Sequence, residues 1–302
     1  MEEWQKIGKT PLKELKEIEK YFHLPIRIWA KLEHQNASGS VKDRPAYFIL
    51  QDAIKEKKLC PGMKIVEASS GNMGISLSMI GTALGYEVDI VMPESMSLER
   101  RTLIQKQRGK LILTEAARGM KGAVETVEEW KKRENIFVPS QFENGNNVRA
   151  HYEGTGPEIF SQMNEKIDAF CASFGSGGTI TGVGKYCKEK DKSICVITAE
   201  PSASPLLSKG IAGKHRIEGI GANFLPSILD TSLIDDIVLV DEEESIQMAK
   251  LIAKLEGEKV GISSGANVVA VLKAMKKHPN LKHFVTVFPD SSSRYGEILN
   301  EK

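Results

Sequence analysis

Cysteine is scarce in this 302-residue chain, and its spacing excludes several kinds of site. The four cysteines, Cys60, Cys171, Cys187 and Cys195, contain no C-x-x-C pair. A zinc ribbon, an iron–sulfur site or a disulfide framework would need paired or regularly spaced cysteines. We therefore expect reduced thiols, as in a cytoplasmic protein.

The chain also lacks an excess of charge, a long apolar run and a metal-binding histidine pattern. Lys plus Arg number 41 against 40 Asp plus Glu, so no long-range field attracts nucleic acid or an anionic membrane. No run of about 18 apolar residues and no signal-like start occurs, so we expect neither membrane insertion nor secretion. The six histidines show no H-x-x-x-H or H-E-x-x-H spacing, so no metal site is predicted. The expected partner is a small molecule.

What the sequence does contain is an alternation of short β-branched runs with longer helical patterns. The expected strands are 26–31, 64–67, 88–92, 110–113, 136–138, 169–174, 194–199, 236–240 and 283–288. Between them, apolar residues recur every three or four positions at 74–83, 119–133 and 242–255, which predicts helices. This order predicts an α/β protein with helices packed on parallel strands. Ligands are then expected at the carboxyl ends of the strands.

A glycine-rich loop follows the expected strand at 169–174. It reads Gly175-Ser176-Gly177-Gly178-Thr179 and precedes a helical pattern. Glycines let backbone N–H groups converge on a phosphate, and the two hydroxyls can donate as well, so the loop predicts a phosphate cup. It is neither a dinucleotide fingerprint, because Ile180 stands where the last glycine belongs, nor a Walker loop, which needs a lysine. A glycine-rich turn without a ligand is the alternative.

Two further loops lead from small residues into helices. In the segment 36–44, Lys42 would lie in the first turn, where the helix dipole disfavours its ammonium form. Taken alone, Lys42 also fits a solvated surface lysine. In the segment 69–74, free N–H groups and hydroxyls suit a carboxylate, and Asn72 could bond a phenolic oxygen. An ordinary helix cap explains that segment equally well.

The segment Gly261-Ile262-Ser263-Ser264-Gly265 formally matches the nucleophile elbow of hydrolases. That fold needs an acid and then a histidine after the serine, yet no Asp or Glu lies between Ser263 and His278 or His283. Ser263 is therefore interpreted as a neutral hydrogen-bonding partner.

Taken together and in this order, the loops resemble the cysteine synthase (O-acetylserine sulfhydrylase) and cystathionine β-synthase group of fold-type II pyridoxal 5'-phosphate (PLP) enzymes. The resemblance spans nearly the whole chain. Its motifs are IGKTPL at 7–12, KLE at 31–33, SVKDR at 40–44, MPESMSLERR at 92–101, QFEN at 141–144, TGPE at 155–158, EGIGA at 218–222 and PD at 289–290. The resemblance implies two open twisted-sheet α/β domains with the cofactor in the cleft between them.

The resemblance also assigns roles to individual residues. Lys42 would form the Schiff base with PLP, Asn72 would contact the ring oxygen, and Ser263 would face the pyridine nitrogen. The expected cofactor site also includes Gly175, Ser176, Gly177, Gly178, Thr179, Pro289 and Asp290. The expected substrate site comprises Ser69, Ser70, Gly71, Met73, Gln141, Gly219 and Asn223.

The implied reaction is β-elimination or β-replacement on L-cysteine or O-acetyl-L-serine through an aminoacrylate intermediate. A serine at the pyridine nitrogen stabilises the protonated ring less than an aspartate does, which favours elimination over transamination. Lys42 would remove the Cα proton and later return it.

Two departures from the family pattern bear on the product. Met73 stands where the family usually has a threonine, and Asn223 stands where cysteine synthases usually have a glycine. If Asn223 narrows the pocket and bonds a water or a thiol, the chain would consume cysteine and release hydrogen sulfide. The alternative is that Asn223 points away or is tolerated variation.

The resemblance further implies a smaller mobile domain at residues 38–140, with 1–37 and 141–302 forming the larger, phosphate-binding domain. It implies a homodimer, and a serine acetyltransferase is a further candidate partner. The nucleophile would be a thiol, sulfide or water. A serine or threonine dehydratase is the nearest alternative enzyme, and a non-catalytic regulatory relative is the alternative of another class.

Overall fold

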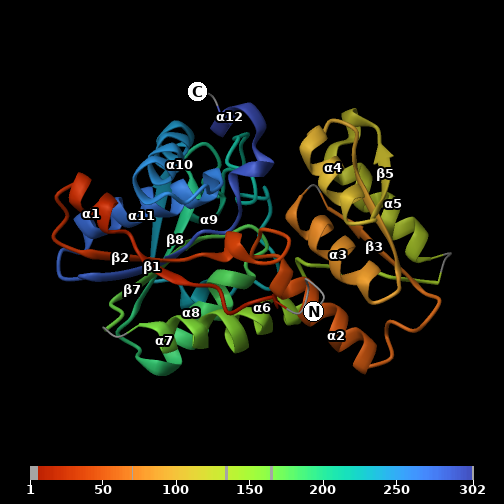
Figure 1. Cartoon of the computed structure of the whole chain (residues 1–302), viewed down its shortest axis with the longest axis horizontal. Coiled ribbons are helices and arrows are strands. Elements are labelled where there is room, and N and C mark those ends of the chain that lie inside the picture. Colours follow the sequence, from red (N-terminus) through yellow and green to blue (C-terminus); the bar gives the residue numbers. More distant parts are fainter. Residues whose placement is uncertain (1–5, 70, 133–134, 164–165, 301–302) are drawn as a thin grey trace.

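The computed structural model describes residues 6–69, 71–132, 135–163 and 166–300, and it contains two separate β-sheets. Figure 1 shows the helices and strands of the two sheets as two lobes side by side, with α2 at their junction. The predicted α/β class with two open sheets is confirmed.

The larger sheet has six strands in the order β1-β2-β10-β7-β8-β9. These strands are β1 (Leu12–Glu14), β2 (Arg27–Lys31), β10 (His283–Val287), β7 (Ala169–Ser173), β8 (Cys195–Pro201) and β9 (Asp236–Val240). All neighbours pair in parallel except β1, which pairs with β2 in antiparallel register. The sequence did not predict β1, because Leu12, Lys13 and Glu14 form no β-branched run.

The smaller sheet has four parallel strands in the order β5-β4-β3-β6. They are β5 (Lys110–Thr114), β4 (Glu87–Pro93), β3 (Lys64–Ala68) and β6 (Ile136–Phe137). All nine predicted strands therefore form, with ends shifted by up to two residues. The domain boundary at residues 38–140 stays a prediction.

Alternating side chains direct helices to both faces of each sheet. In the smaller sheet, Ile65 and Ile90 pack on one face with α2 (Asp43–Lys55), α3 (Asn72–Ala83) and α4 (Leu98–Lys106). On the other face, Val66 and Val91 pack against α5 (Gly119–Lys131). In the larger sheet, one face packs α1 (Lys16–Tyr21), α10 (Glu242–Glu256) and α11 (Ile262–Lys277), and the other packs α7 (Gly156–Gln162) and α8 (Gly178–Lys190).

Shorter elements complete the chain. They are η2 (Glu33–Gln35), η3 (Ala116–Arg118), α6 (Gly145–Ala150), the π-helix η4 (His151–Thr155), α9 (Leu206–Lys209), η5 (Thr231–Leu233), η6 (Ser292–Arg294) and α12 (Gly296–Asn300). The predicted helices 74–83 and 242–255 correspond to α3 and α10. The predicted helix 119–133 corresponds to α5, and its last residue lies outside the described residues.

The start of α2 is fixed by a buried ion-pair cluster. The Arg44 guanidinium donates to both oxygens of Glu33, at 2.7 and 2.8 Å, and to both oxygens of Glu158, each at 2.7 Å. The fully buried Lys31 ammonium lies 2.8 Å from the same Glu158 carboxylate. Such forked, charge-assisted bonds constrain orientation as well as distance. Arg44 thereby ties α2 to η2 and α7.

Candidate active site

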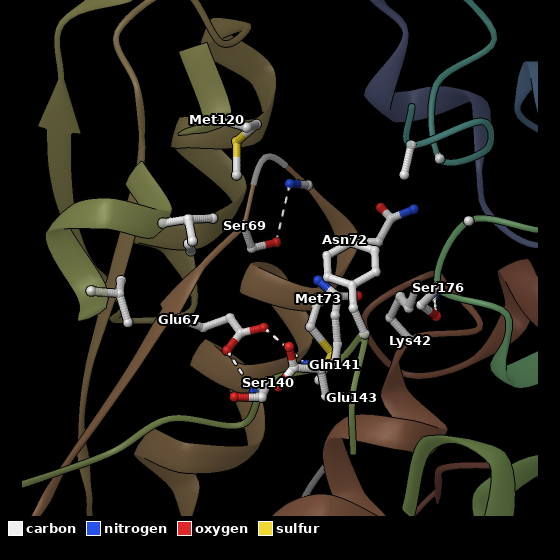
Figure 2. A pocket seen from close by; sticks show the side chains of 18 of the residues that line it. Lys42, Glu67, Ser69, Asn72, Met73, Met120, Ser140, Gln141, Glu143 and Ser176 are labelled. Atoms are coloured by element: carbon white, nitrogen blue, oxygen red, sulfur yellow. Dashed lines mark hydrogen bonds between the residues drawn. The ribbon is translucent and has the colours of Figure 1, made fainter. Parts of the chain in front are cut away.

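A single cavity of about 510 Å³ collects most of the residues predicted for the site. It is lined by Lys42, by the end of β3 and start of α3, by residues 140–143, by Gly175 and Ser176, and by the segment around Gly219. Figure 2 shows Lys42 and Ser176 on one side of this space and Glu67, Ser69 and Ser140 on the other. Its volume is typical of a small-molecule site. Because β3 and β7 belong to different sheets, both sheets contribute to it.

Lys42 lies directly before the first residue of α2 and reaches the glycine-rich loop. Its Nζ donates a hydrogen bond to Ser176 Oγ at 3.1 Å, across 134 positions of sequence. Burial lowers the pKa of Lys42 to about 8, although the charge of Asp290 acts in the opposite direction. A meaningful fraction of free amine is therefore present near neutral pH, as a nucleophilic lysine requires.

The loop from Gly175 to Thr179 joins β7 to the start of α8 and is tightly enclosed. Gly177 has a φ of +89°, which favours glycine. A Cβ on Gly175 would lie 2.1 Å from the Gly219 carbonyl oxygen, and one on Gly178 would lie 2.0 Å from Asn147 Oδ1. Only glycine fits at these points, and the following helix turns its first N–H groups toward the loop.

Two residues behind the loop hold its hydroxyls and were not singled out from the sequence. Asn147 Nδ2 donates to Ser176 Oγ at 2.9 Å, and His151 Nε2 lies 3.3 Å from Thr179 Oγ1. Burial lowers the pKa of His151 to about 3, and the charge of Arg44 acts in the same direction. His151 is therefore neutral at physiological pH. No local motif distinguishes either residue, because both act through tertiary contacts.

These residues fit pyridoxal phosphate. At Gly175 and Gly178 the loop leaves no room for a Cβ, and the Lys42 amine lies 3.1 Å from Ser176 Oγ of the same loop. A group that carries both a phosphate and an aldehyde would meet both features. One carboxylate oxygen nearby, Asp290 Oδ1, is buried without a hydrogen-bond partner among the described residues.

Asn72 is held by side chains from the C-terminal segment. Its Nδ2 donates to Asp290 Oδ2 at 2.7 Å, and its Oδ1 accepts from Arg294 Nε. Tyr295 donates its hydroxyl to the same Asp290 oxygen at 2.9 Å. These contacts join the start of α3 to the larger sheet. Asn72 lines the cavity, while its contact with the cofactor ring stays a prediction.

The predicted substrate loop is ordered by its own serine. Ser69 Oγ accepts hydrogen bonds from Gly74 N at 3.1 Å and Gly71 N at 3.4 Å. Met73, the second residue of α3, is 1% exposed, packs in the core of the smaller sheet and also lines the cavity. Gln141 is buried and lines the cavity as well. Ser70 lies outside the described residues.

Among the described residues, seven predicted site residues do not line the cavity, and they are Gly177, Gly178, Thr179, Asp290, Ser263, Pro289 and Asn223. Ser263 is buried in the first turn of α11, and Pro289 accepts the Val41 N–H through its carbonyl oxygen at 2.7 Å. Asn223 has a φ of +59°, and its Oδ1 accepts from Ser204 Oγ at 2.9 Å. The neighbours of Asn223 in sequence, Ala222 and Phe224, do line the cavity. Substrate contact by Asn223 stays a prediction that this arrangement does not support.

The positive φ gives a physical reason for the residue at position 223. Glycine and asparagine are the residues that adopt left-handed backbone most readily. Glycine is usual here in the family pattern, so asparagine preserves the turn. The Asn223 amide oxygen accepts the hydrogen bond from Ser204, and neither residue is among the described residues that line the cavity.

Glu67 is a cavity residue that sequence reasoning missed. It lies in β3, two positions before Ser69, and its carboxylate accepts backbone N–H bonds from Ser140 at 3.0 Å and Gln141 at 3.4 Å. Burial raises the pKa of Glu67 to about 7 despite these bonds. Glu67 could have been recognised from the sequence as an acidic residue inside an otherwise apolar strand.

Comparison with known proteins decides the family. The family described as pyridoxal-phosphate dependent enzyme matches residues 3–290. This chain belongs to that family. Cysteine synthase B of Campylobacter jejuni is 47% identical over 96% of this chain and 94% of its own length.

Solved structures of family members have the same fold. Cysteine synthase of Entamoeba histolytica superposes with a TM-score of 0.93 at 37% identity, covering 99% of this chain and 90% of that one. A hydrogen sulfide-producing enzyme of Fusobacterium nucleatum gives 0.92 at 39% identity, covering 97% of both chains. The predicted fold-type II assignment, the cysteine synthase-like family and the PLP dependence are confirmed.

Neither a membrane-spanning helix nor a cluster of metal ligands occurs among the described residues. None of the helices there has the length and apolar content needed to span a bilayer. In the same parts of the chain, no three histidine, cysteine, aspartate or glutamate side chains gather as metal ligands would.

The raised pKa of Glu67 predicts a pH-dependent stability difference. The folded state keeps the proton up to about pH 7, whereas the unfolded state releases it near the ordinary value of 4.5. Stability therefore falls as pH rises between these values. Urea unfolding of the wild type and Glu67→Gln, followed by circular dichroism, should show the wild type losing roughly 2–3 kcal/mol relative to the variant from about pH 5 to 8. If the free energies of unfolding of the two proteins changed with pH in the same way, Glu67 would ionise near its ordinary pKa.

The close packing of the cup predicts a selective effect of one methyl group. Gly175→Ala should weaken PLP binding by at least about tenfold, because its Cβ must displace the Gly219 backbone. Gly145→Ala is the matched control, since nothing lies within 4 Å of its added Cβ. PLP titration followed by absorbance, with melting temperature measured in parallel, tests this. Equal affinities of the two variants would contradict the tight cup.

Proposed function

We propose that this chain catalyses PLP-dependent β-elimination and β-replacement on L-cysteine or O-acetyl-L-serine. The observation that carries the proposal is the Lys42 amine 3.1 Å from Ser176 in the glycine loop, within one cavity that also includes the loop at Ser69 to Met73. The names of the relatives support this class, since they include cysteine synthases and hydrogen sulfide-producing enzymes.

The glycine loop and Lys42 have different proposed roles. The loop Gly175 to Thr179 would hold the cofactor phosphate at the start of α8, and Lys42 would anchor the aldehyde carbon. When bound, PLP supplies an electron sink for a carbanion at Cα. Lys42 Nζ, with its pKa near 8, is placed to take the Cα proton and to return it later.

The start of α3 would bind the substrate carboxylate. Its first N–H groups and the helix dipole favour an anion, and Ser69 fixes the shape of the loop. Gln141 lines the cavity beside this loop and offers an amide donor. The amino acid would thus lie between α3 and Lys42.

We further propose that cysteine is a substrate and hydrogen sulfide a product. Met73 presents a thioether to the cavity where the family pattern has a hydroxyl, so the wall is less polar than in that pattern. A less polar wall suits a thiol leaving group better than an acetate. The hydrogen sulfide-producing relative supports the same activity.

The remaining family expectations stay proposals. Residues 38–140 would form a smaller mobile domain that closes over the substrate, with 1–37 and 141–302 as the larger domain. The bonds of Arg100 to Glu218 and of Asn72 to Asp290 connect the two sides and would be remade on closure. A homodimer, docking to a serine acetyltransferase and a cytoplasmic location are proposed from the family likeness.

Product analysis tests the proposed function. The enzyme loaded with PLP should form cysteine from O-acetylserine and sulfide, and should release sulfide and serine or lanthionine from cysteine alone. All five compounds and pyruvate are quantified by chromatography and a sulfide assay. Pyruvate from serine as the main product would indicate a dehydratase instead, and no turnover with any substrate would indicate a binding protein.

Two lysine variants, one in the site and one outside it, test the role of Lys42 in the same assay. Lys42→Ala should abolish the visible absorbance of the bound cofactor and lower turnover by at least about 10²-fold. Lys121→Ala, at an exposed position on α5, should change neither.

The geometry of position 223 predicts the product distribution of a variant. Asn223→Gly should leave the ratio of cysteine, serine, lanthionine and sulfide within about twofold of the wild type, because the side chain bonds Ser204 and glycine adopts the same φ. Chromatography of the same reactions measures it. A strong shift of the ratio would restore Asn223 as a residue that contacts the nucleophile.

A further inference from the structure

Glu67 is a buried acid in the cavity wall that has no role in the proposed function. It is 3% exposed and lies near the end of β3, in the smaller sheet. Figure 2 shows its carboxylate directed at Ser140 and Gln141, which follow β6 in the chain. Burying an acid costs free energy unless its oxygens are bonded. The bonds of this carboxylate therefore indicate what the acid does.

The Glu67 carboxylate bonds the backbone of a strained turn. Its two oxygens accept one N–H group each, from Ser140 at 3.0 Å and from Gln141 at 3.4 Å. Ser140 has a φ of +53°, a left-handed conformation that residues other than glycine adopt at a cost. The Ser140 carbonyl oxygen then accepts from Glu143 N at 2.9 Å and Asn144 N at 3.0 Å. Glu67 therefore stabilises a turn that a serine by itself disfavours.

Hydrogen bonds continue from this turn to Lys42. Asn147 Nδ2 donates to the Gln141 carbonyl oxygen at 2.8 Å and to Ser176 Oγ at 2.9 Å. Ser176 Oγ in turn accepts from Lys42 Nζ at 3.1 Å. Gln141 is itself buried and lines the cavity. The conformation of the turn therefore determines where Gln141 lies and how Asn147 contacts the glycine loop.

The strength of the two bonds to the turn depends on whether Glu67 carries a proton. A carboxylate accepts hydrogen bonds at both oxygens, whereas a protonated carboxyl group has one oxygen committed to its O–H. Burial raises the pKa of Glu67 to about 7, so both forms are present near neutral pH. When Glu67 is protonated, one of the two backbone N–H groups loses its ionised acceptor. When Glu67 is ionised, both N–H groups are held.

Other ionisable groups near β3 are paired or lie elsewhere along the cavity. Glu87 and Asp89 on the neighbouring strand β4 lie 3.6 and 3.0 Å from the Lys64 ammonium, at the other end of β3. Within their described ranges, α3 and β6 carry no ionisable side chain. The other ionisable side chains of the cavity wall are Glu128 on α5, Lys42, Arg100, Glu143 and Tyr295. Burial and the two backbone bonds are what shift the pKa of Glu67, so its ionisation is linked to the turn.

We propose that Glu67 is a positioning residue of the amino-acid site, whose ionised carboxylate holds the turn at Ser140 and thereby keeps Gln141 in place for the substrate. This inference rests on the proposed function, in which Gln141 lines the amino-acid site. Glu67 acts only through the backbone of the turn and takes part in no covalent step. Affinity for an amino acid should therefore increase as Glu67 loses its proton.

The variant Glu67→Gln tests the proposal, because glutamine has one acceptor oxygen, as the protonated acid does. L-Alanine has no β-substituent to lose, so its affinity for the PLP-loaded enzyme can be measured without turnover, from the change in cofactor absorbance. At about pH 6 the wild type and the variant should bind alanine within about twofold of each other. At about pH 8 the variant should bind at least about fivefold more weakly. The protonation of alanine affects both proteins equally and cancels in the ratio.

Ser140→Gly provides a rescue, because glycine adopts left-handed backbone without the cost that serine has. Added to Glu67→Gln, it should restore alanine affinity at about pH 8 to within about threefold of the wild type. Alone, it should strengthen alanine binding at about pH 6 by about threefold, and this gain should disappear by about pH 8. This second comparison keeps Glu67, so it tests the proposal even where Glu67→Gln does not fold.

Two matched variants control for general effects. Glu19 is also a buried glutamate that accepts a backbone N–H, from Ile28 at 2.7 Å, but it is not among the described residues that line the cavity. Glu19→Gln should leave alanine affinity unchanged at both pH values. His23 is exposed and has a φ of +51°, so His23→Gly relaxes a similar conformation elsewhere and should not rescue Glu67→Gln.

Two results would overturn the proposal. One is a ratio of wild-type to Glu67→Gln affinity that stays constant or falls between about pH 6 and 8, and a falling ratio would show that the Glu67 charge repels the ligand carboxylate. The other is failure of Ser140→Gly to restore binding. Either result refutes the positioning role alone while cysteine still forms from O-acetylserine and sulfide. Absence of turnover, with the expected alanine affinities, refutes the proposed function and leaves the positioning role supported.

Discussion

The position of Lys42 depends on the buried guanidinium of Arg44. Arg44 follows Lys42 by two residues and is bonded to Glu33 and Glu158 through four short contacts. Burial opposes the charge on Glu158, yet the Arg44 bonds hold the pKa of that carboxyl to about 2, so the pair stays ionised across the physiological range. Removal of either partner would leave an uncompensated buried charge, which is strongly destabilising. The cluster therefore fixes the start of α2 where the two sheets meet.

Two loops from different sheets meet at the cavity beside the start of α2. The glycine loop follows β7 of the larger sheet, and the loop at Ser69 follows β3 of the smaller one. Carboxyl ends of parallel strands are the usual place for ligands, but here two such ends face each other across one cavity. Lys42 reaches from the residue before α2 to the glycine loop, and Asn72 reaches from α3 to Asp290. Relative movement of the sheets therefore changes the site directly.

The sequence predicted what local patterns encode. The β-branched runs predicted the nine strands that pair in parallel with at least one neighbour, because a buried parallel strand is apolar on both faces and stands out from its helices. Strand β1 carries Lys13 and Glu14 on an edge and shows no such contrast. The glycine loop was recognisable from the sequence, because a backbone that closely approaches a phosphate leaves no room for side chains. Asn147 and His151 support that loop from another part of the chain, and no spacing rule connects positions so distant. Glu67 was missed for a related reason: its raised pKa arises from burial, which depends on the packed strands around it.

Asn223 shows why a departure from a family pattern is ambiguous until the backbone is known. From the sequence, an amide in place of a hydrogen atom suggested a new contact in the pocket. With φ at +59°, the position selects glycine or asparagine for conformational reasons before any ligand is considered. To reach the cavity, the amide would have to break its bond to Ser204, at a cost of about 1 kcal/mol. Met73 faces no such requirement, because it already forms part of the cavity wall. The thioether of Met73 is thus a departure from the family pattern that changes the polarity of the cavity wall without remaking the backbone.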